Sequence, residues 1–100
     1  MGWRIELRPE ALADLEEAVE WYETRSTGLG SRLVREFLRA ISSLEDAPLV
    51  PRLRHRRLGV RWIFPKRFPY RIVYRIEGES VVVLAIIHAA RRDTRWRGRT

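Results

Sequence analysis

The sequence contains no cysteine, two histidines and a single lysine in 100 residues. The lack of cysteine excludes disulfides and thiolate-bound metals, and two histidines that lie far apart, His55 and His88, make no metal-binding motif. We therefore expect neither a metal nor any other cofactor.

Long hydrophobic runs are also missing, since no apolar stretch approaches the roughly 18 residues that a membrane span needs. Met1 leads directly into a segment of alternating polarity rather than into a basic stretch and an apolar block, so no signal peptide is expected. Both absences predict a cytoplasmic protein with no membrane partner. The length and the 45% hydrophobic fraction predict one globular domain over residues 1–100.

Acidic residues are scarce in the second half of the chain. Residues 51–100 carry fourteen Arg or Lys against three acidic residues, whereas residues 1–25 carry three Arg against seven acidic residues. The net charge is +7, and all but one of the twenty cations are arginine, whose planar guanidinium suits bidentate contacts to phosphate or carboxylate. This asymmetry indicates a nucleic acid or an acidic protein as partner, or alternatively a solvated basic surface.

The first half of the chain has the pattern of a strand and two helices. Residues 3–8 alternate between apolar and charged side chains, which predicts a half-buried strand. Apolar residues then recur at helical spacing over residues 10–25 and 31–45, with two glycines in the break between them. Two helices joined so closely should lie antiparallel. The acidic residues of the first helix, Asp14 among them, are interpreted as its solvated outer face.

The second half has the pattern of three strands. Residues 49–54 are expected to form a loop, and residues 56–64 a strand that bends or bulges at Gly59. Residues 69–77 and 80–88 are rich in Val, Ile and Tyr, and only Gly78-Glu79 separates them, which predicts a hairpin with a type II′ turn. The predicted register pairs Glu77 with Ser80, Tyr74 with Val83 and Arg71 with Ile86.

Side chains alternate across a strand, so this register assigns every hairpin residue to one of two faces. The predicted core face carries Tyr70, Ile72, Tyr74, Ile76, Val81, Val83, Ala85 and Ile87. The opposite face carries Arg71, Val73, Arg75, Glu77, Val82, Leu84, Ile86 and His88. His88 is expected within reach of Arg71 there. An apolar strip among cations indicates a contact surface, covered by a partner or by the chain's own tail through Trp96.

A strand, a helix pair and three further strands predict an α+β fold. The last three strands should form an antiparallel meander that shares one sheet with the N-terminal strand, with both helices on one face. The apolar run over residues 81–87 predicts a central strand. The N-terminal strand should lie beside it and run parallel to a neighbour, because the helix pair supplies the crossover.

The stretch FPYRIVYR is followed by a hydrophobic strand that ends in His88, then by Arg91-Arg92-Asp93 and Trp96. This pattern resembles the C-terminal half of the RelE/ParE-type toxins of bacterial type II toxin-antitoxin systems. The resemblance continues upstream through RRLGVRWIFPKRFPYR and into the N-terminal strand and helix pair, so it covers nearly the whole chain. It is closer to the ParE-like branch, and it implies a toxin that inhibits DNA gyrase without catalysis and is neutralised by a cognate antitoxin.

The predicted faces and the resemblance together select candidate site residues. Those expected to bind the target are Arg61, Lys66, Arg71, Arg75, His88, Arg91, Arg92 and Trp96. Those expected to bind the antitoxin form the apolar strip, Val73, Val82, Leu84 and Ile86.

Two other functions stay open. The RelE-like branch implies metal-independent cleavage of mRNA on the ribosome, in which His88 would act as acid or base and Arg71 would stabilise charge on the phosphate. However, no tyrosine follows Tyr74 and the chain has one lysine, so the basic cluster and late tyrosine of a RelE-type site have no clear counterpart. A non-toxic, basic nucleic-acid-binding module is the third possibility.

Several of these residues also have structural interpretations. His88, at a strand end, can hydrogen-bond Asp93 or the backbone, and Trp96 can pack the tail onto the sheet. Tyr70 and Tyr74 fall on the predicted core face, which indicates structural rings. Arg71 and Arg75 fall on the other face, where contact with a target or antitoxin is the better interpretation.

Overall fold

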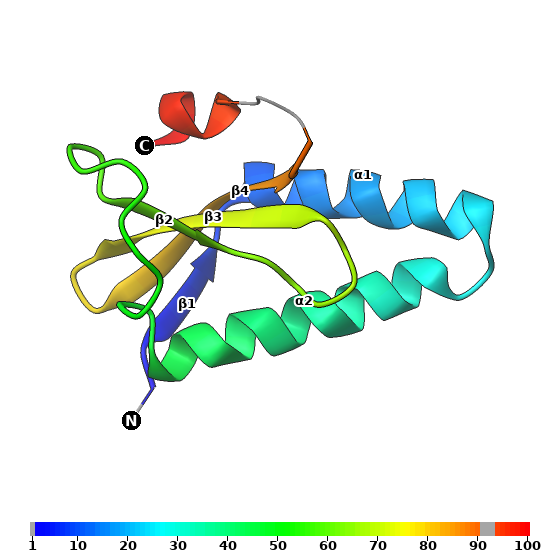
Figure 1. The fold of residues 1–100 in the computed structure, drawn as a ribbon, viewed down its shortest axis with the longest axis horizontal. Helices are drawn as coiled ribbons and strands as arrows, with labels where there is room; N and C mark the ends of the chain where they lie inside the picture. Colours follow the sequence, from blue (N-terminus) through cyan, green and yellow to red (C-terminus); the bar gives the residue numbers. More distant parts are fainter. Residues whose placement is uncertain (1, 91–93) are drawn as a thin grey trace.

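The four strands and the two long helices follow the predicted order, and a short C-terminal helix that was not predicted follows them. The computed structural model describes residues 2–90 and 94–100. The elements are β1 (Arg4–Leu7), α1 (Pro9–Arg25), α2 (Leu29–Asp46), β2 (Val60–Ile63), β3 (Tyr70–Glu77), β4 (Ser80–His88) and the short 3₁₀ helix η1 (Arg95–Arg99) (Figure 1). The α+β class is confirmed. Within the described ranges, no helix has the length and apolar character to cross a membrane.

The four strands form one sheet in the order β1-β4-β3-β2. β1 pairs with β4 in parallel, with Ile5 opposite Val81, and β4, β3 and β2 form an antiparallel meander. β4 is therefore the central strand that its apolar run predicts, and it is buried from Val81 to Ile87. Buried on both faces, such a strand needs no alternation of polarity.

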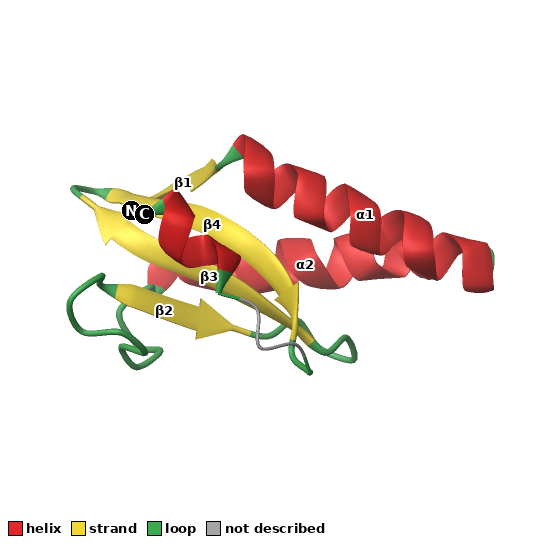
Figure 2. Ribbon diagram, turned by 90° about the horizontal axis from the view of Figure 1, so that it is seen from above, coloured by secondary structure: helices red, strands yellow, loops and turns green. Residues whose placement is uncertain are grey.

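The two helices form a hairpin and cover one face of the sheet, and η1 lies in front of the other face in Figure 2. The helices approach closely at Gly30, where a Cβ atom would lie 2.9 Å from the carbonyl oxygen of Val19. The N–H of Gly30 donates to the carboxylate of Glu23 at 3.0 Å. The core cluster between helices and sheet includes Ala11, Leu15, Ala18, Leu33, Phe37, Leu44, Ile72, Tyr74, Val81 and Val83.

The turn between β3 and β4 forms as predicted. Gly78 has a φ of +61°, and Glu79 is not among the residues with positive φ, which is the pattern of a type II′ turn. Glu77 pairs with Ser80, and Tyr74 pairs with Val83, so the predicted register is confirmed over this half of the hairpin.

A β-bulge changes the register in the other half. Val73 pairs with Ala85, so Leu84 is the extra residue of β4, and Arg71 lies opposite Ile87 rather than Ile86. Each later residue of β4 consequently changes face. Ile86 lies in the core beneath the helices, and Ala85 and Ile87 lie in a second core cluster on the other face. The predicted faces of these three residues are therefore wrong.

β2 is shorter than predicted, with four residues in place of residues 56–64. Gly59 has a φ of +67°, and the chain before it folds back onto the start of β2. The N–H groups of Arg54 and His55 both donate to the carbonyl of Val60, at 2.8 and 3.4 Å. β2 is an edge strand, and this loop, residues 47–59, hydrogen-bonds its first residue.

Candidate target-binding surface

The sheet face opposite the helices is covered by the C-terminal segment. Trp96 of η1 is only 5% exposed. It belongs to the second core cluster with Val60, Val73, Val82, Leu84, Ala85 and Ile87. The structural interpretation of Trp96, as the residue that packs the tail onto the sheet, is confirmed.

The apolar strip that the sequence predicts on this face is not exposed. Val73, Val82 and Leu84 are each at most 1% exposed, and Ile86 is buried on the helix side. The sequence predicts that either a partner or the chain's own tail covers this face, and in the structure the tail covers it through Trp96. A role for these four residues in antitoxin binding stays a prediction, and for the first three it requires η1 to leave the sheet.

Asp14 of α1 anchors this tail. Its carboxylate accepts hydrogen bonds from Arg95 at 3.2 Å, from Arg99 at 2.7 Å and from the backbone N–H of Ile86 at 3.0 Å. Arg99 also donates to the carbonyl of Leu84, the bulged residue, at 2.9 Å. Asp14 is 8% exposed, so its interpretation as part of a solvated acidic face is wrong. The carboxylate hydrogen-bonds β4 beyond the point where β1 ends.

His88 lies on the helix side of the sheet. It pairs with Tyr70, and the two rings meet edge to face with their centroids 5.2 Å apart. Its Nδ1 accepts a hydrogen bond from the N–H of Ala90 at 3.1 Å. His88 and Tyr70 line a cavity of about 380 Å³ beside α1. Arg71 instead lies over Trp62, which packs on the second core cluster, so the predicted proximity of His88 and Arg71 is wrong.

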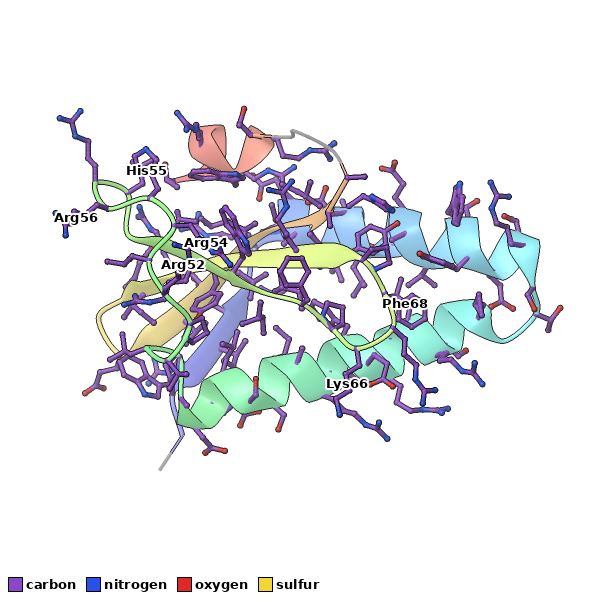
Figure 3. The ribbon with its side chains drawn as sticks, in the orientation of Figure 1. Arg52, Arg54, His55, Arg56, Lys66 and Phe68 are labelled. Atoms are coloured by element: carbon purple, nitrogen blue, oxygen red, sulfur yellow. The ribbon has the colours of Figure 1, made fainter. Side chains whose placement is uncertain are left out.

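Arg71 belongs to a group of arginines around Trp62. The guanidinium carbons of Arg54 and Arg71 lie 4.8 and 5.3 Å from the centre of the Trp62 ring. Desolvation lowers the pKa of Arg54, and the positive charges of Arg52 and Arg71 lower it further. Figure 3 shows Arg52 and Arg54 in the loop before β2. These three guanidinium groups therefore concentrate positive charge beside the edge strand.

Two other predicted target-binding cations have structural partners. The Nε of Arg61 donates to the carbonyl of Pro51 at 2.8 Å and so fixes the start of the loop before β2. The Nε of Arg75 pairs with the carboxylate of Glu77 at 2.8 Å. Arg61 therefore helps to position the Arg52–Arg54 loop, and the charge of Arg75 is offset within β3.

The remaining predicted cations do not join the group around Trp62. Lys66 is exposed in the connection between β2 and β3, well away from Arg52 and Arg54 in Figure 3. Arg91 and Arg92 lie outside the described residues. The structure thus brings Arg71 to the Arg54 loop, and it separates Arg71 from His88.

Tyr74 supports the same loop from the core. Its side chain is fully buried, and its hydroxyl donates to the carbonyl of Pro48 at 2.7 Å, just after α2. Burial raises the pKa of Tyr74 to about 12, with the charge of Arg61 acting in the opposite direction. The predicted structural role of this ring is confirmed.

Sequence reasoning missed three residues of this region, Asp14, Arg52 and Arg54. For Asp14 a signal was present, because its spacing from Ala11 and Ala18 places it on the apolar face of α1. For the two arginines the sequence shows only basic residues in a loop. The approach of Arg54 to Trp62, and of Arg52 to Arg54, depends on how residues 47–59 fold back onto β2.

The group of arginines around Trp62 is suited to binding anions. The arginines around Trp62 can neutralise phosphate or carboxylate charge, whereas His88 lies across the sheet from them. Across residues 2–90 and 94–100, no group of three or more His, Asp or Glu side chains is placed to hold a metal.

Comparison with known proteins gives one family and several similar folds. Residues 5–93 match the family described as the ParE toxin of the type II toxin-antitoxin system, parDE. The fold is similar to the chromosomal ParDE toxin-antitoxin system from P. aeruginosa, with a TM-score of 0.76 and 18% identity over 86% of this chain and 95% of that chain. It is also similar to the toxin-antitoxin complex RelBE2 from Mycobacterium tuberculosis, with a TM-score of 0.61 and 24% identity over 88% of this chain and 99% of that chain. No curated protein sequence matches the chain.

Proposed function

Because the chain belongs to the ParE toxins of type II toxin-antitoxin systems, we propose that it inhibits DNA gyrase and that a cognate antitoxin neutralises it. The family match over residues 5–93 carries this proposal. We also propose that the protein acts in the cytoplasm, where gyrase and its DNA are found.

The site geometry favours a toxin that binds its target over one that cleaves RNA. Cleavage of the RelE kind needs an acid or base within hydrogen-bond reach of a phosphate that cations hold. His88 contacts Tyr70 on the helix side, whereas Arg71 lies over Trp62 on the other side of the sheet. These two residues cannot act on the same phosphate in this arrangement.

The antitoxin is the second partner in the proposal. Both similar structures are toxin-antitoxin systems, which supports a cognate antitoxin for this chain. We expect it to be partly disordered when free and to fold on the toxin, because small regulatory segments that wrap a partner commonly order on binding. The product of the neighbouring gene should restore growth when it is co-expressed.

The experiment that tests the proposal separates the two targets directly. The protein is expressed alone, and gyrase–DNA cleavage complexes and intact transcripts are measured in the same cells. We expect cleavage complexes to accumulate while transcripts remain. Purified protein should inhibit supercoiling by gyrase, and it should not cut mRNA with or without ribosomes. Ribosome-dependent cleavage that is lost in His88→Ala would contradict the proposal and identify a ribonuclease.

Point variants are better probes of the basic tail than truncation. Residues 94–100 include Trp96 and Arg99, which contribute to the core and to the Asp14 anchor, so deleting them would disturb the fold. The double variant Arg91→Ala with Arg92→Ala tests the expected target contact and leaves Trp96 and Arg99 in place. We expect this double variant to lose toxicity, and a fully toxic double variant would show that these arginines only solubilise the tail.

A further inference from the structure

Two arginines in the loop before β2 lie beside other positive charges. Arg52 and Arg54 are exposed. Within residues 2–90 and 94–100 neither of them forms an ion pair. The ion pairs described there use Arg8, Arg39, Arg75, Arg95 and Arg99. The guanidinium donors of Arg52 and Arg54 are therefore available to a ligand.

The loop that carries these arginines is held in place by hydrogen bonds. The side chain of Arg61 binds the carbonyl of Pro51 at 2.8 Å, immediately before Arg52. The backbone N–H of Arg54 donates to the carbonyl of Val60 at 2.8 Å. The two guanidinium groups are thus presented from a fixed backbone, which lowers the entropy lost when they bind a ligand.

The repulsion within this group indicates what kind of ligand it accepts. Arg54 is close enough to Arg52 and Arg71 for their charges to lower its pKa. An anion placed between such groups relieves the repulsion, and phosphate oxygens match the planar donors of a guanidinium. An anionic ligand is therefore more strongly favoured here than at a single surface arginine.

The position of Trp62 favours the phosphate backbone of a nucleic acid over its bases. One part of the indole packs on the second core cluster, and the guanidinium groups of Arg54 and Arg71 lie over the ring. Stacking on a base needs an uncovered aromatic face. The ring instead supports Arg54, which is a phosphate contact that does not depend on sequence.

We propose that Arg52 and Arg54, of which Arg54 lies over Trp62, bind the phosphate backbone of duplex DNA. The choice of DNA rests on the proposed function, because gyrase is a target that holds duplex DNA. In that setting the toxin contacts the DNA as well as the enzyme. The contact is independent of base sequence and weakens as salt rises.

The test compares two double variants of the full chain. Arg52→Gln with Arg54→Gln removes the proposed contacts. Arg32→Gln with Arg35→Gln is the matched control, because it lowers the net charge equally at exposed residues of α2 that form no ion pair within the described ranges. Binding to a fluorescein-labelled, mixed-sequence DNA duplex is measured by anisotropy as a function of salt.

The expected effect follows from counterion release. Each phosphate contact contributes about 0.9 to the slope of log K against log salt, so losing two contacts should reduce the slope by about 2. When the salt concentration rises from about 50 to 200 mM, the ratio of the wild-type DNA association constant to that of the loop variant should therefore fall about tenfold. The control variant should keep the wild-type slope. Equal slopes for the two double variants, or tighter binding to single-stranded RNA than to the duplex, would overturn the assignment.

A gyrase assay on the same proteins separates this site from the proposed function. If the wild type traps gyrase on DNA and the loop variant does not, both inferences are supported. If the wild type has no effect on gyrase while the loop variant alone loses DNA binding, the DNA site stands and the gyrase proposal fails. If the wild type traps gyrase and the loop variant still binds DNA normally, the site fails and the gyrase proposal stands.

Discussion

Replacing Asp14 should release the C-terminal segment from the sheet. Asp14→Asn keeps the size of the side chain and one acceptor oxygen, which can still receive the N–H of Ile86. It removes the negative charge that Arg95 and Arg99 share. The substitution therefore tests the anchor of η1 with little change in packing.

The magnitude follows from the exposure of the two partners. A hydrogen bond to a charged group contributes about 1.5 to 3 kcal/mol, and the side chain of Arg99 is 17% exposed, so its bond to Asp14 should be in this range. The side chain of Arg95 is 38% exposed, so its pair is expected to contribute only about 0 to 1 kcal/mol. Asp14→Asn should therefore lower the free energy of unfolding by about 1.5 to 4 kcal/mol. Asp14→Ala should cost about 1 to 3 kcal/mol more, because the N–H of Ile86 loses its acceptor.

Two assays measure this effect. Urea unfolding gives the change in global stability. Limited trypsin digestion reports on the tail itself, because Arg95, Arg97 and Arg99 are cleavage sites that η1 protects while it is docked. We expect Asp14→Asn to be cut in the tail faster than the wild type under native conditions.

The matched control is Glu20→Gln, which removes an exposed charge from the same helix. It should leave stability within about 0.5 kcal/mol of the wild type and tail cleavage unchanged. If Asp14→Asn gives the same unfolding curve and the same cleavage rate as Glu20→Gln, then Asp14 does not anchor the tail.

Three further predictions concern the core and the loop. Tyr74→Phe should reduce the loss of stability between about pH 10 and pH 12. The Tyr74 hydroxyl keeps its proton up to about pH 12 in the folded chain but loses it near pH 10.0 in the unfolded chain, so the free energy of unfolding of the wild type falls by about 1.4 kcal/mol per pH unit in that window. Urea unfolding of both proteins at about pH 9 and about pH 11 measures the difference. Ile72→Ala should lower the free energy of unfolding by about 2 to 4 kcal/mol because it leaves a cavity beneath the helices, and an unchanged unfolding curve would contradict the register. Gly30→Ala should also destabilise the chain, since its Cβ would meet the carbonyl of Val19, whereas Gly98→Ala, with nothing near its Cβ, should not.

Local signals were sufficient to predict the two long helices, the four strands and most of the topology. The alternation of residues 3–8, the helical spacing of the two amphipathic segments and the glycine of the II′ turn each act within a few residues of chain. The apolar run of β4 identified the central strand because a strand buried on both faces has no polar positions. Charge asymmetry pointed to the second half of the chain, where the arginines gather around Trp62.

The uniformly apolar sequence that identified β4 as the central strand also hid the bulge at Leu84. In a strand where every residue is apolar, inserting one residue disturbs no pattern, so the faces of Ala85, Ile86 and Ile87 could not be read from the sequence. In the structure, Leu84 and Ile86 hydrogen-bond Arg99 and Asp14. These contacts join residues more than ten positions apart, which no local pattern records.

By itself, the sequence determined the class of fold, the order of the strands and the half of the chain that carries the excess positive charge, because these depend on periodicity, turn chemistry and composition. Only the tertiary structure decided that η1 covers Val73, Val82 and Leu84, that His88 and Arg71 lie on opposite faces and that Arg54 meets Trp62 beside Arg52. The face on which His88 lies depends on the one-residue bulge in β4, and the position of Arg54 depends on the loop that folds back onto the edge strand β2. The physical reason is that one added residue in β4 reverses the faces of everything after it, while the hydrophobic free energy that the sequence pattern reports stays almost the same.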